Sequence, residues 1–234
     1  MLSVVMPAHN EEGLLEASVR DVVRELRARD QQFEVVVVEN GSTDATPAIA
    51  ARLAVEVPEV RTLTWHHADY GGALRTGFLE AAGDLVVIFD VDYYEFSFLD
   101  RAVAALEAAD GPDLVIGSKR GAGSRDTRAW SRRLVTTVFS QILKVGFGLT
   151  VSDTHGIKVV RRAPLKDLAA ACRYGTDLFD TELVLRAERA GLAVTEIPVV
   201  VEERRPSRSS IVKRIPRTVL GLVRLRIALW REKP

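Results

Sequence analysis

The feature that most constrains the fold of this chain is a regular alternation of short apolar runs with longer amphipathic segments. Strand patterns fall at residues 3–7, 34–38, 60–64, 85–89 and 114–117. Helical patterns lie between them, at residues 14–28, 46–54, 72–82 and 98–109. Apolar runs of this kind are typical of parallel strands that are buried on both faces. We therefore expect an α/β fold with a mostly parallel, doubly wound sheet and helices on both of its faces.

The second half of the chain is less regular. Its segments are, in order, a Gly- and Arg-rich loop at 118–128, a helical pattern at 130–145, a short piece at 153–160, a helical pattern at 178–190 and a strand pattern at 194–201. No internal repeat or low-complexity linker separates this half from the first. We therefore expect residues 1–203 to form one domain.

Composition is that of an ordinary globular protein, with 47% hydrophobic and 27% charged residues among 234. The single cysteine, Cys172, excludes an internal disulfide and a cysteine-based zinc site, which suits a reducing cytoplasm. The N-terminus enters a strand pattern directly, so we expect no signal peptide. No apolar run in the sequence reaches the length of a membrane span.

Charge is divided unevenly along the chain, although the formal net charge is zero. Residues 204–234 carry ten Lys or Arg and one acid, Glu232, which leaves 22 basic and 31 acidic residues before them. Such a split indicates that the tail meets an anionic partner. A nucleic acid, an acidic membrane face and a phosphorylated substrate all have this charge.

Polar loops follow three of the predicted strands, at residues 7–12, 39–44 and 90–92. Ligands bind at the C-terminal ends of the strands in open α/β sheets, so these loops should converge on one site. Asp90 and Asp92 stand one residue apart, and two carboxylates this close repel each other unless a cation lies between them. A divalent cation with a phosphate-rich ligand fits this need. The alternatives are that the aspartates cap the next helix and that the loops are ordinary turns.

Four segments together make the sequence recognisable. They are residues 7–12 (PAHNEE), 38–46 (VENGSTDAT), 70–77 (YGGALRTG) and 89–92 (FDVD). In this order they resemble the family 2 glycosyltransferases, and most closely the members that load a sugar onto a polyprenyl phosphate. The resemblance covers nearly the whole chain. It implies the Rossmann-like A-type glycosyltransferase fold, a nucleotide-sugar donor such as GDP-mannose or a UDP-hexose, and a divalent metal, Mg²⁺ or Mn²⁺.

The resemblance implies a nucleotide site at the strand ends. Its expected residues are Pro7, Ala8, His9, Asn10, Glu11, Glu39, Asn40, Gly41, Ser42, Arg75, Asp90, Val91 and Asp92. Asp90 and Asp92 match the family's Asp-x-Asp, which implies a catalytic role and metal binding for both. Asn40 stands where many members have an aspartate, and its neutral amide oxygen is a weaker acceptor than a carboxylate. For Arg75, a solvated helix charge is an equal alternative.

A second set of side chains is implied for the phosphate of the acceptor. It consists of Lys119, Arg132, Arg133, His155, Arg205 and Arg208. A satisfied structural histidine is an equal alternative for His155. Members that use polyprenyl phosphate often carry a glutamine two residues after Asp-x-Asp as a further metal ligand. This chain has Tyr94 there, so we expect the metal to keep an extra water or to recruit Glu95.

The chemistry depends on the acceptor. A phosphate monoester is already anionic near neutral pH, so it attacks without a strong general base. Positioning and stabilisation of the departing nucleotide diphosphate then supply the catalysis. A hydroxyl acceptor needs a carboxylate base, for which Asp153, Asp180 and Glu182 are the candidates. We favour Glu182 as a charge that complements a helix N-terminus, and leave Asp180 open.

Residues 204–234 are expected to form a basic loop and a basic amphipathic helix. Ile, Val and Leu recur among Lys and Arg from residue 211 to Trp230, which is typical of a segment in the membrane interface. Pro216 predicts a short lead-in or a helix that begins near this proline. The alternative is a helix that packs onto the domain or onto a second subunit. Nucleic acid is disfavoured as the partner because aromatic residues are few in the tail and the body is acidic.

The sequence thus predicts a metal-dependent, inverting hexosyltransferase that acts on polyprenyl phosphate at the inner face of the plasma membrane. A homodimer and a separate membrane-protein partner both stay open. The alternatives are the same fold with a polysaccharide or small-molecule acceptor, and a non-catalytic protein that binds a nucleotide sugar. Dehydrogenases and phosphate-loop ATPases are disfavoured, because neither glycine-rich fingerprint follows the first strand.

Overall fold

The computed structural model describes residues 1–118, 125–126, 130–173, 175, 178–201 and 211–231. The side chains of 125–126, 130–136, 201 and 211–217 are not described. A seven-stranded sheet forms the centre, in the order β3 (Val60–Trp65), β2 (Phe33–Asn40), β1 (Leu2–Ala8), β4 (Leu85–Ile88), β7 (Lys158–Arg161), β5 (Leu114–Ser118) and β8 (Val194–Pro198). Neighbouring strands are parallel except β7, which is antiparallel to β4 and β5. The expected α/β class is confirmed.

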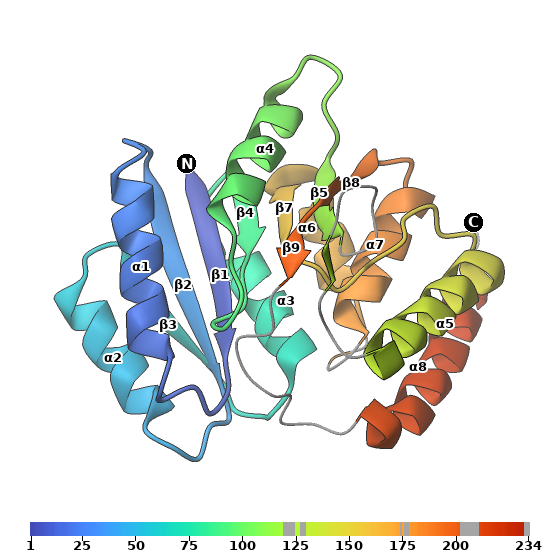
Figure 1. The fold of residues 1–234 in the computed structure, drawn as a ribbon, viewed down its shortest axis with the longest axis horizontal. Coiled ribbons are helices and arrows are strands. Elements are labelled where there is room, and N and C mark those ends of the chain that lie inside the picture. Colours follow the sequence, from blue (N-terminus) through green and yellow to red (C-terminus); the bar gives the residue numbers. More distant parts are fainter. Residues whose placement is uncertain (119–124, 127–129, 174, 176–177, 202–210, 232–234) are drawn as a thin grey trace.

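Helices cover both faces of the sheet (Figure 1). One hydrophobic core lies under α1 (Leu15–Arg27), α2 (Thr46–Glu56) and α4 (Phe96–Glu107). The other lies under α3 (Tyr70–Glu80), α5 (Trp130–Phe147), α6 (Arg162–Ala171), α7 (Phe179–Arg189) and α8 (Ile211–Arg231). The doubly wound arrangement follows from the strands, which present apolar side chains to both sides.

Strand β1 shows why both faces need a cover. All of its residues are buried, and they alternate between the two cores: Val4 and Met6 belong to the first core, whereas Val5 belongs to the second. Its neighbours β2 and β4 pair with it in parallel, so the three strands end at the same edge of the sheet. This edge is at the bottom of Figure 1.

Two elements of the second half, β7 and α6, were not predicted from the sequence. Strand β7 has four residues and begins with the charged Lys158, so its apolar signal is short. Helix α6 follows it without a loop and was not expected. The strand expected at 194–201 is interrupted at the buried Val199, and its last part, β9 (Val200–Val201), pairs with β6 (Arg125–Asp126) in a separate two-stranded sheet.

The C-terminal helix is confirmed, but its predicted start is wrong. Helix α8 begins at Ile211 and continues through Pro216, which lies in its second turn. A proline there removes one main-chain donor, and the long helical segment that follows keeps its own hydrogen bonds. Within the described part of the chain, every helix is too short or too polar to cross a membrane.

Gly156 provides a test of the packing around β7. A Cβ at this position would overlap the carbonyl oxygen of Gly117, whose own amide donates to Ile157 O over 2.8 Å. We expect Gly156→Ala to lower the free energy of unfolding by about 1–3 kcal/mol, because main-chain atoms must move apart. Urea denaturation measures this.

The matched control is Gly146→Ala in the exposed last part of α5, where a Cβ would meet no atom within 4 Å. Alanine favours a helix over glycine by about 1 kcal/mol, so this variant should be as stable as the parent or more stable. Equal denaturation midpoints for Gly156→Ala and the parent would contradict the close packing.

Candidate active site

The loops after β1, β2 and β4 meet at one edge of the sheet, as the sequence predicted, and hydrogen bonds join the first two. His9 Nδ1 donates to Asn40 O over 2.9 Å, and Asn10 N donates to Ser42 Oγ over 3.0 Å. Asn10 has a φ of 55°, a left-handed conformation that asparagine tolerates better than most residues. Glu11 N donates to Thr46 Oγ1 over 2.7 Å, which ties the first loop to the start of α2.

The second loop is held from within and from a third segment. Ser42 N donates to Glu39 Oε1 over 2.6 Å, and Thr43 N donates to Asn10 Oδ1 over 2.8 Å. Gly41 has a φ of 69°, and a Cβ there would lie 2.9 Å from Ala68 N. Glycine is therefore required both for its conformation and for the close approach of the chain at 67–68. The side chains of Glu39 and Asn10, expected at the nucleotide, thus also shape the loops.

Pro7 and Ala8 are buried inside β1, and Asn40 is buried at the end of β2. Asn40 Oδ1 accepts no hydrogen bond from the residues that the structure describes. A buried oxygen without a donor costs about 1–3 kcal/mol, and such groups in native proteins have a reason. The N–H of a bound base, or the hydroxyl of a bound ribose, would donate to this oxygen and remove the cost. The arrangement fits the acceptor role that the sequence predicts for Asn40.

Asp90 and Asp92 lie on a tight turn after β4. Asp90 N donates to Tyr93 O over 3.1 Å, and Tyr93 N donates to Asp90 O over 3.2 Å. Between them, Val91 packs into the core, and its carbonyl accepts a 2.7 Å hydrogen bond from Ser18 Oγ on α1. The turn is therefore fixed on both sides, and Val91 offers only its main chain to a ligand.

The turn does not cap α4, because the N-cap residue of that helix is Glu95. Both aspartates are partly exposed. The alternative prediction, that the two aspartates cap the next helix, is therefore wrong. Hard oxygen donors placed this way suit a divalent cation with a phosphate ligand.

Tyr70, at the start of α3, is a site residue that the sequence reading missed. Its hydroxyl donates to Asp90 Oδ1 over 2.8 Å. Burial, and then the negative charges of Asp90, Asp180 and Asp92, raise the pKa of Tyr70 well above its usual value. The phenol therefore keeps its proton at neutral pH and acts as a permanent donor that orients Asp90. Its signal was the aromatic residue that opens the 70–77 segment.

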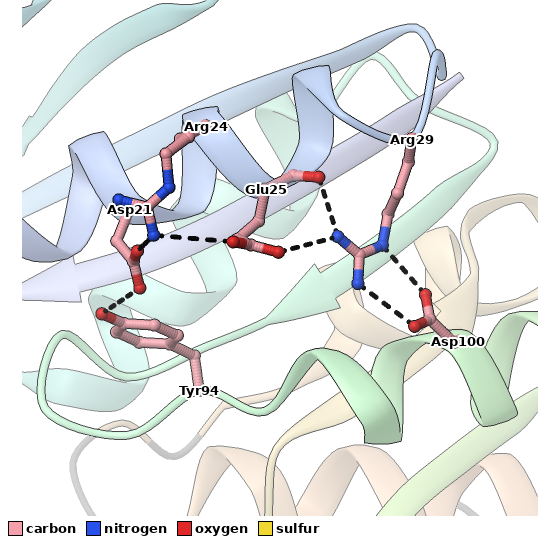
Figure 2. Close-up of polar contacts among 6 residues, drawn as sticks. All are labelled: Asp21, Arg24, Glu25, Arg29, Tyr94 and Asp100. Carbon is pink, nitrogen blue, oxygen red and sulfur yellow. Dashed lines mark hydrogen bonds and ion pairs between the residues drawn. The ribbon is translucent and has the colours of Figure 1, made fainter.

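Tyr94 and Glu95, the two residues considered for the metal site, form hydrogen bonds with other protein side chains. The Tyr94 hydroxyl donates to Asp21 on α1 over 3.0 Å, at the edge of an ionic network that reaches Arg29 and Asp100 (Figure 2). Glu95 accepts a 2.6 Å hydrogen bond from Ser97 Oγ at the start of α4. The expectation that Glu95 is recruited as a metal ligand has no support in this geometry. An extra water on the metal stays a prediction.

Arg75 forms hydrogen bonds with a neighbouring helix. Its Nε and Nη2 donate to the main-chain oxygens of Ala169 and Ala170 over 3.2 and 2.7 Å. These carbonyls belong to the last turn of α6, and Ala169 O also accepts a 3.2 Å hydrogen bond from Cys172 N. In this structure Arg75 therefore joins α3 to α6, and its contact with the diphosphate stays a prediction.

On the acceptor side, the sequence-predicted acids are buried. Asp153 is 6% exposed, and its Oδ1 accepts from His155 N over 3.0 Å. Its own amide donates to Glu196 Oε1 over 2.9 Å. His155 is exposed, with its ring against Phe139 of α5 and Nδ1 3.1 Å from Thr154 Oγ1. An imidazole at the surface of this loop can still meet a ligand.

Asp180 forms a buried ion pair. Its Oδ1 lies 2.8 Å from Lys158 Nζ, and the two side chains are 4% and 1% exposed. The lysine also donates to Gly156 O over 2.7 Å. Glu182 is fully buried and is held by Arg186 at 2.8 Å and by the Arg173 amide at 2.9 Å. Both acids therefore join α7 to its surroundings, and Lys158 is a buried cation that the sequence reading did not single out.

Five of the predicted acceptor-phosphate residues cannot be placed. Lys119, Arg205 and Arg208 lie outside the described residues, and of Arg132 and Arg133 only the main chain in α5 is described. Their roles stay predictions. Among the residues that are described, no three His, Cys, Asp or Glu side chains form a complete metal site by themselves. A cation at Asp90 and Asp92 would need ligands from the bound nucleotide or water.

Comparison with known proteins agrees with this geometry. The family described as Glycosyl transferase family 2 matches residues 3–169. Glycosyltransferase AglD of Haloferax volcanii is 30% identical over 98% of this chain, which spans 37% of that relative's length. Dolichyl-phosphate hexose transferase of the same organism is 30% identical over 87% of this chain and 83% of its own.

Two solved structures share the architecture. Glucosyl-3-phosphoglycerate synthase from Mycobacterium tuberculosis, with Mn²⁺, UDP-glucose and phosphoglyceric acid, matches 97% of this chain and 79% of its own, with a TM-score of 0.71 and 23% identity. Mannosyltransferase PcManGT from Pyrobaculum calidifontis, with GDP-Man and Mn²⁺, matches 100% of this chain and 65% of its own, with a TM-score of 0.66 and 25% identity. The expected A-type fold is confirmed.

The Lys158–Asp180 pair gives a stability prediction. Lys158→Met leaves a buried carboxylate without its cation, so we expect a loss of about 3–5 kcal/mol in the free energy of unfolding. The double variant Lys158→Met/Asp180→Leu removes both charges and should recover most of this loss. Lys166→Met, on the exposed side of α6, is the control and should stay within about 0.5 kcal/mol. A double variant no more stable than the single one would refute the pairing.

Proposed function

Because this chain belongs to glycosyl transferase family 2, we propose that it is an inverting enzyme that moves a hexose from a nucleotide sugar to polyprenyl phosphate. The similarity to dolichyl-phosphate hexose transferase supports this acceptor. The observation that carries the proposal is the state of the predicted bases. Asp180 and Glu182 are buried in ion pairs, and Asp153 is buried in a loop. An acceptor that is already anionic does not need any of them to take a proton.

The donor is a nucleotide sugar, bound at the ends of β1, β2 and β4. Asn40 Oδ1, which has no donor among the described residues, supplies an acceptor for the base or ribose, and His9 lies exposed beside it. The structural neighbours hold UDP-glucose in one case and GDP-Man in the other. Both a UDP-hexose and GDP-mannose are therefore donors to test.

A divalent cation, Mg²⁺ or Mn²⁺, fits the two carboxylates of Asp90 and Asp92, which are hard oxygen ligands on a fixed turn. Tyr70 orients Asp90 through its hydroxyl. When bound, the cation would neutralise charge on the departing nucleotide diphosphate. The neighbours that contain Mn²⁺ support this assignment.

We assign residues 1–203 to catalysis and residues 204–234 to the acceptor and its membrane. Lys119, Arg132, Arg133, Arg205 and Arg208 would surround the acceptor phosphate with positive charge, and His155 would approach it from the loop at 152–156. The protein then works at the inner face of the plasma membrane. A second subunit and a membrane-protein partner stay open predictions.

A second candidate acceptor is a small phosphorylated molecule. The Mycobacterium tuberculosis synthase, which shares the fold, binds phosphoglyceric acid. Its phosphate has the same charge as a polyprenyl phosphate, so the cationic set would suit either. The lipid is favoured because the C-terminal segment is basic and apolar together.

Donor turnover tests the proposal. Purified protein with Mn²⁺ receives GDP-mannose, UDP-glucose and UDP-N-acetylglucosamine in turn, each with polyprenyl phosphate, with phosphoglyceric acid or with no acceptor. We expect product with the lipid phosphate alone, and a loss of more than about a hundredfold in Asp92→Asn because charge stabilisation is removed.

The control for that loss is Asp100→Asn, whose carboxylate bonds to Arg29 on the surface between α1 and α4 (Figure 2). Its turnover should equal that of the parent. Product with phosphoglyceric acid alone would move the assignment to the second candidate. No product with any pair would overturn the proposal.

Tyr70→Phe tests the orientation of Asp90. The variant removes one hydroxyl, and outer-shell partners of metal ligands typically contribute 10–100-fold to metal affinity. We expect Mn²⁺ to bind about 10–100-fold more weakly in calorimetric titrations with a saturating nucleoside diphosphate. Tyr94→Phe, which loses a hydroxyl bonded to Asp21, is the matched control and should bind as the parent does. Equal affinities in the two variants would contradict the role of Tyr70.

A further inference from the structure

Exposed large hydrophobic side chains concentrate on two helices of the described structure. Eleven such residues occur, and eight of them lie on α5 and α8: Val138, Ile142, Val145, Val219, Leu220, Val223, Ile227 and Trp230. The two helices are neighbours (Figure 1), and the guanidinium of Arg226 in α8 lies 5.7 Å from the ring centroid of Phe147 in α5. Contiguous exposed apolar surface marks an interaction site, whereas single exposed residues do not.

Helix α8 has two apolar stripes with different tasks. The inner stripe, Leu222, Leu225 and Leu229, is buried in the second core. It is fixed at two points: Arg189 of α7 donates to Leu229 O over 3.1 Å, and Gly221 faces Leu178 so closely that a Cβ would overlap it. The inner stripe seats the helix, so the outer stripe is not needed for folding.

The outer stripe consists of Val219, Leu220, Val223, Ile227 and Trp230, which are 45–67% exposed. Most of these residues are three or four positions apart, so they share one side of the helix. The exposed Arg224, Arg226 and Arg231 are interspersed with this stripe. On α5, Val138, Ile142 and Val145 form a similar exposed stripe, with Lys144 beside it.

The positive charge of α5 and α8 indicates what kind of partner binds this surface. The sequences of α5 and α8 contain nine Lys or Arg and no Asp or Glu. A second copy that placed the same surface against this one would bring cations against cations, which opposes association. Anionic lipid headgroups pair with the cations, and the acyl boundary receives the apolar side chains.

We propose that the outer stripe of α8 and the exposed stripe of α5 lie together in the interface of an anionic bilayer. The seat of α8 lies against Leu178, the residue that directly precedes α7. The benefit for a lipid acceptor rests on the proposed function, whereas the membrane contact itself does not.

Vesicle binding tests the inference. The full chain is sedimented with phosphatidylglycerol/phosphatidylcholine vesicles and with pure phosphatidylcholine vesicles. We expect binding to the anionic vesicles, with a blue shift of the tryptophan emission that Trp230→Phe removes. Val223→Glu/Ile227→Glu and, separately, Ile142→Glu should each weaken binding by at least about tenfold. Val55→Glu, at an 88% exposed site on α2, is the matched control and should bind as the parent does.

Each failure has its own meaning. Unchanged vesicle binding in Val223→Glu/Ile227→Glu, or equal binding to neutral vesicles, would overturn the inference. A concentration-dependent dimer that the same variants dissociate, without vesicle binding, would assign the surface to a second copy instead. If vesicle binding is lost in the variants but no donor and acceptor pair turns over in the parent, the proposed function fails and the membrane surface stands.

Discussion

The complete burial of β1 is the constraint on which the rest of the structure depends. A strand without exposed residues must be covered on both faces and paired on both edges, and β2, β4 and two layers of helices meet these needs. Since its neighbours run parallel to it, their polar loops leave the sheet at the same edge. The carboxylates of Asp90 and Asp92, the amide of Asn40 and the ring of His9 therefore lie at one edge of the sheet as a consequence of how the core is built.

The parts of the fold that could be predicted are those with a strong local signal. The apolar runs of β1 and β2 and the acids after β4 follow from periodicity and from the rule that strand ends carry the site. Strand β7 could not be predicted, because it is four residues long and its Lys158 finds its partner, Asp180, 22 positions later in α7. The same holds for Arg75 and Tyr70: a helical position does not reveal which carbonyl or carboxylate a long side chain meets in three dimensions.

The acids of the second half illustrate how burial limits chemistry. Asp180 and Glu182 open a helix, and the sequence alone favours a structural charge for Glu182 and leaves the role of Asp180 open. In the folded chain each is paired with a cation, and these contacts tie α7 to β7, to the chain after α6 and to its own next turn. Removing one partner of these buried pairs would destabilise the fold far more than removing one partner of the surface pairs between α1 and α4 in Figure 2.

The two apolar stripes of α8 make the rotation of this helix about its own axis important, because each stripe suits a different environment. One side packs on the protein, and the other carries the exposed stripe that we propose to contact a bilayer. The angle of the helix about its own axis would then decide which side of the molecule faces the membrane. Each residue turns an α-helix by about 100°. A single residue inserted before Gly221 would thus leave the composition of the tail almost unchanged, but it would rotate the inner stripe away from the protein core. In that contact, the orientation of the molecule would depend on the rotation of one helix, which the contact of Gly221 with Leu178 and the bond from Arg189 fix.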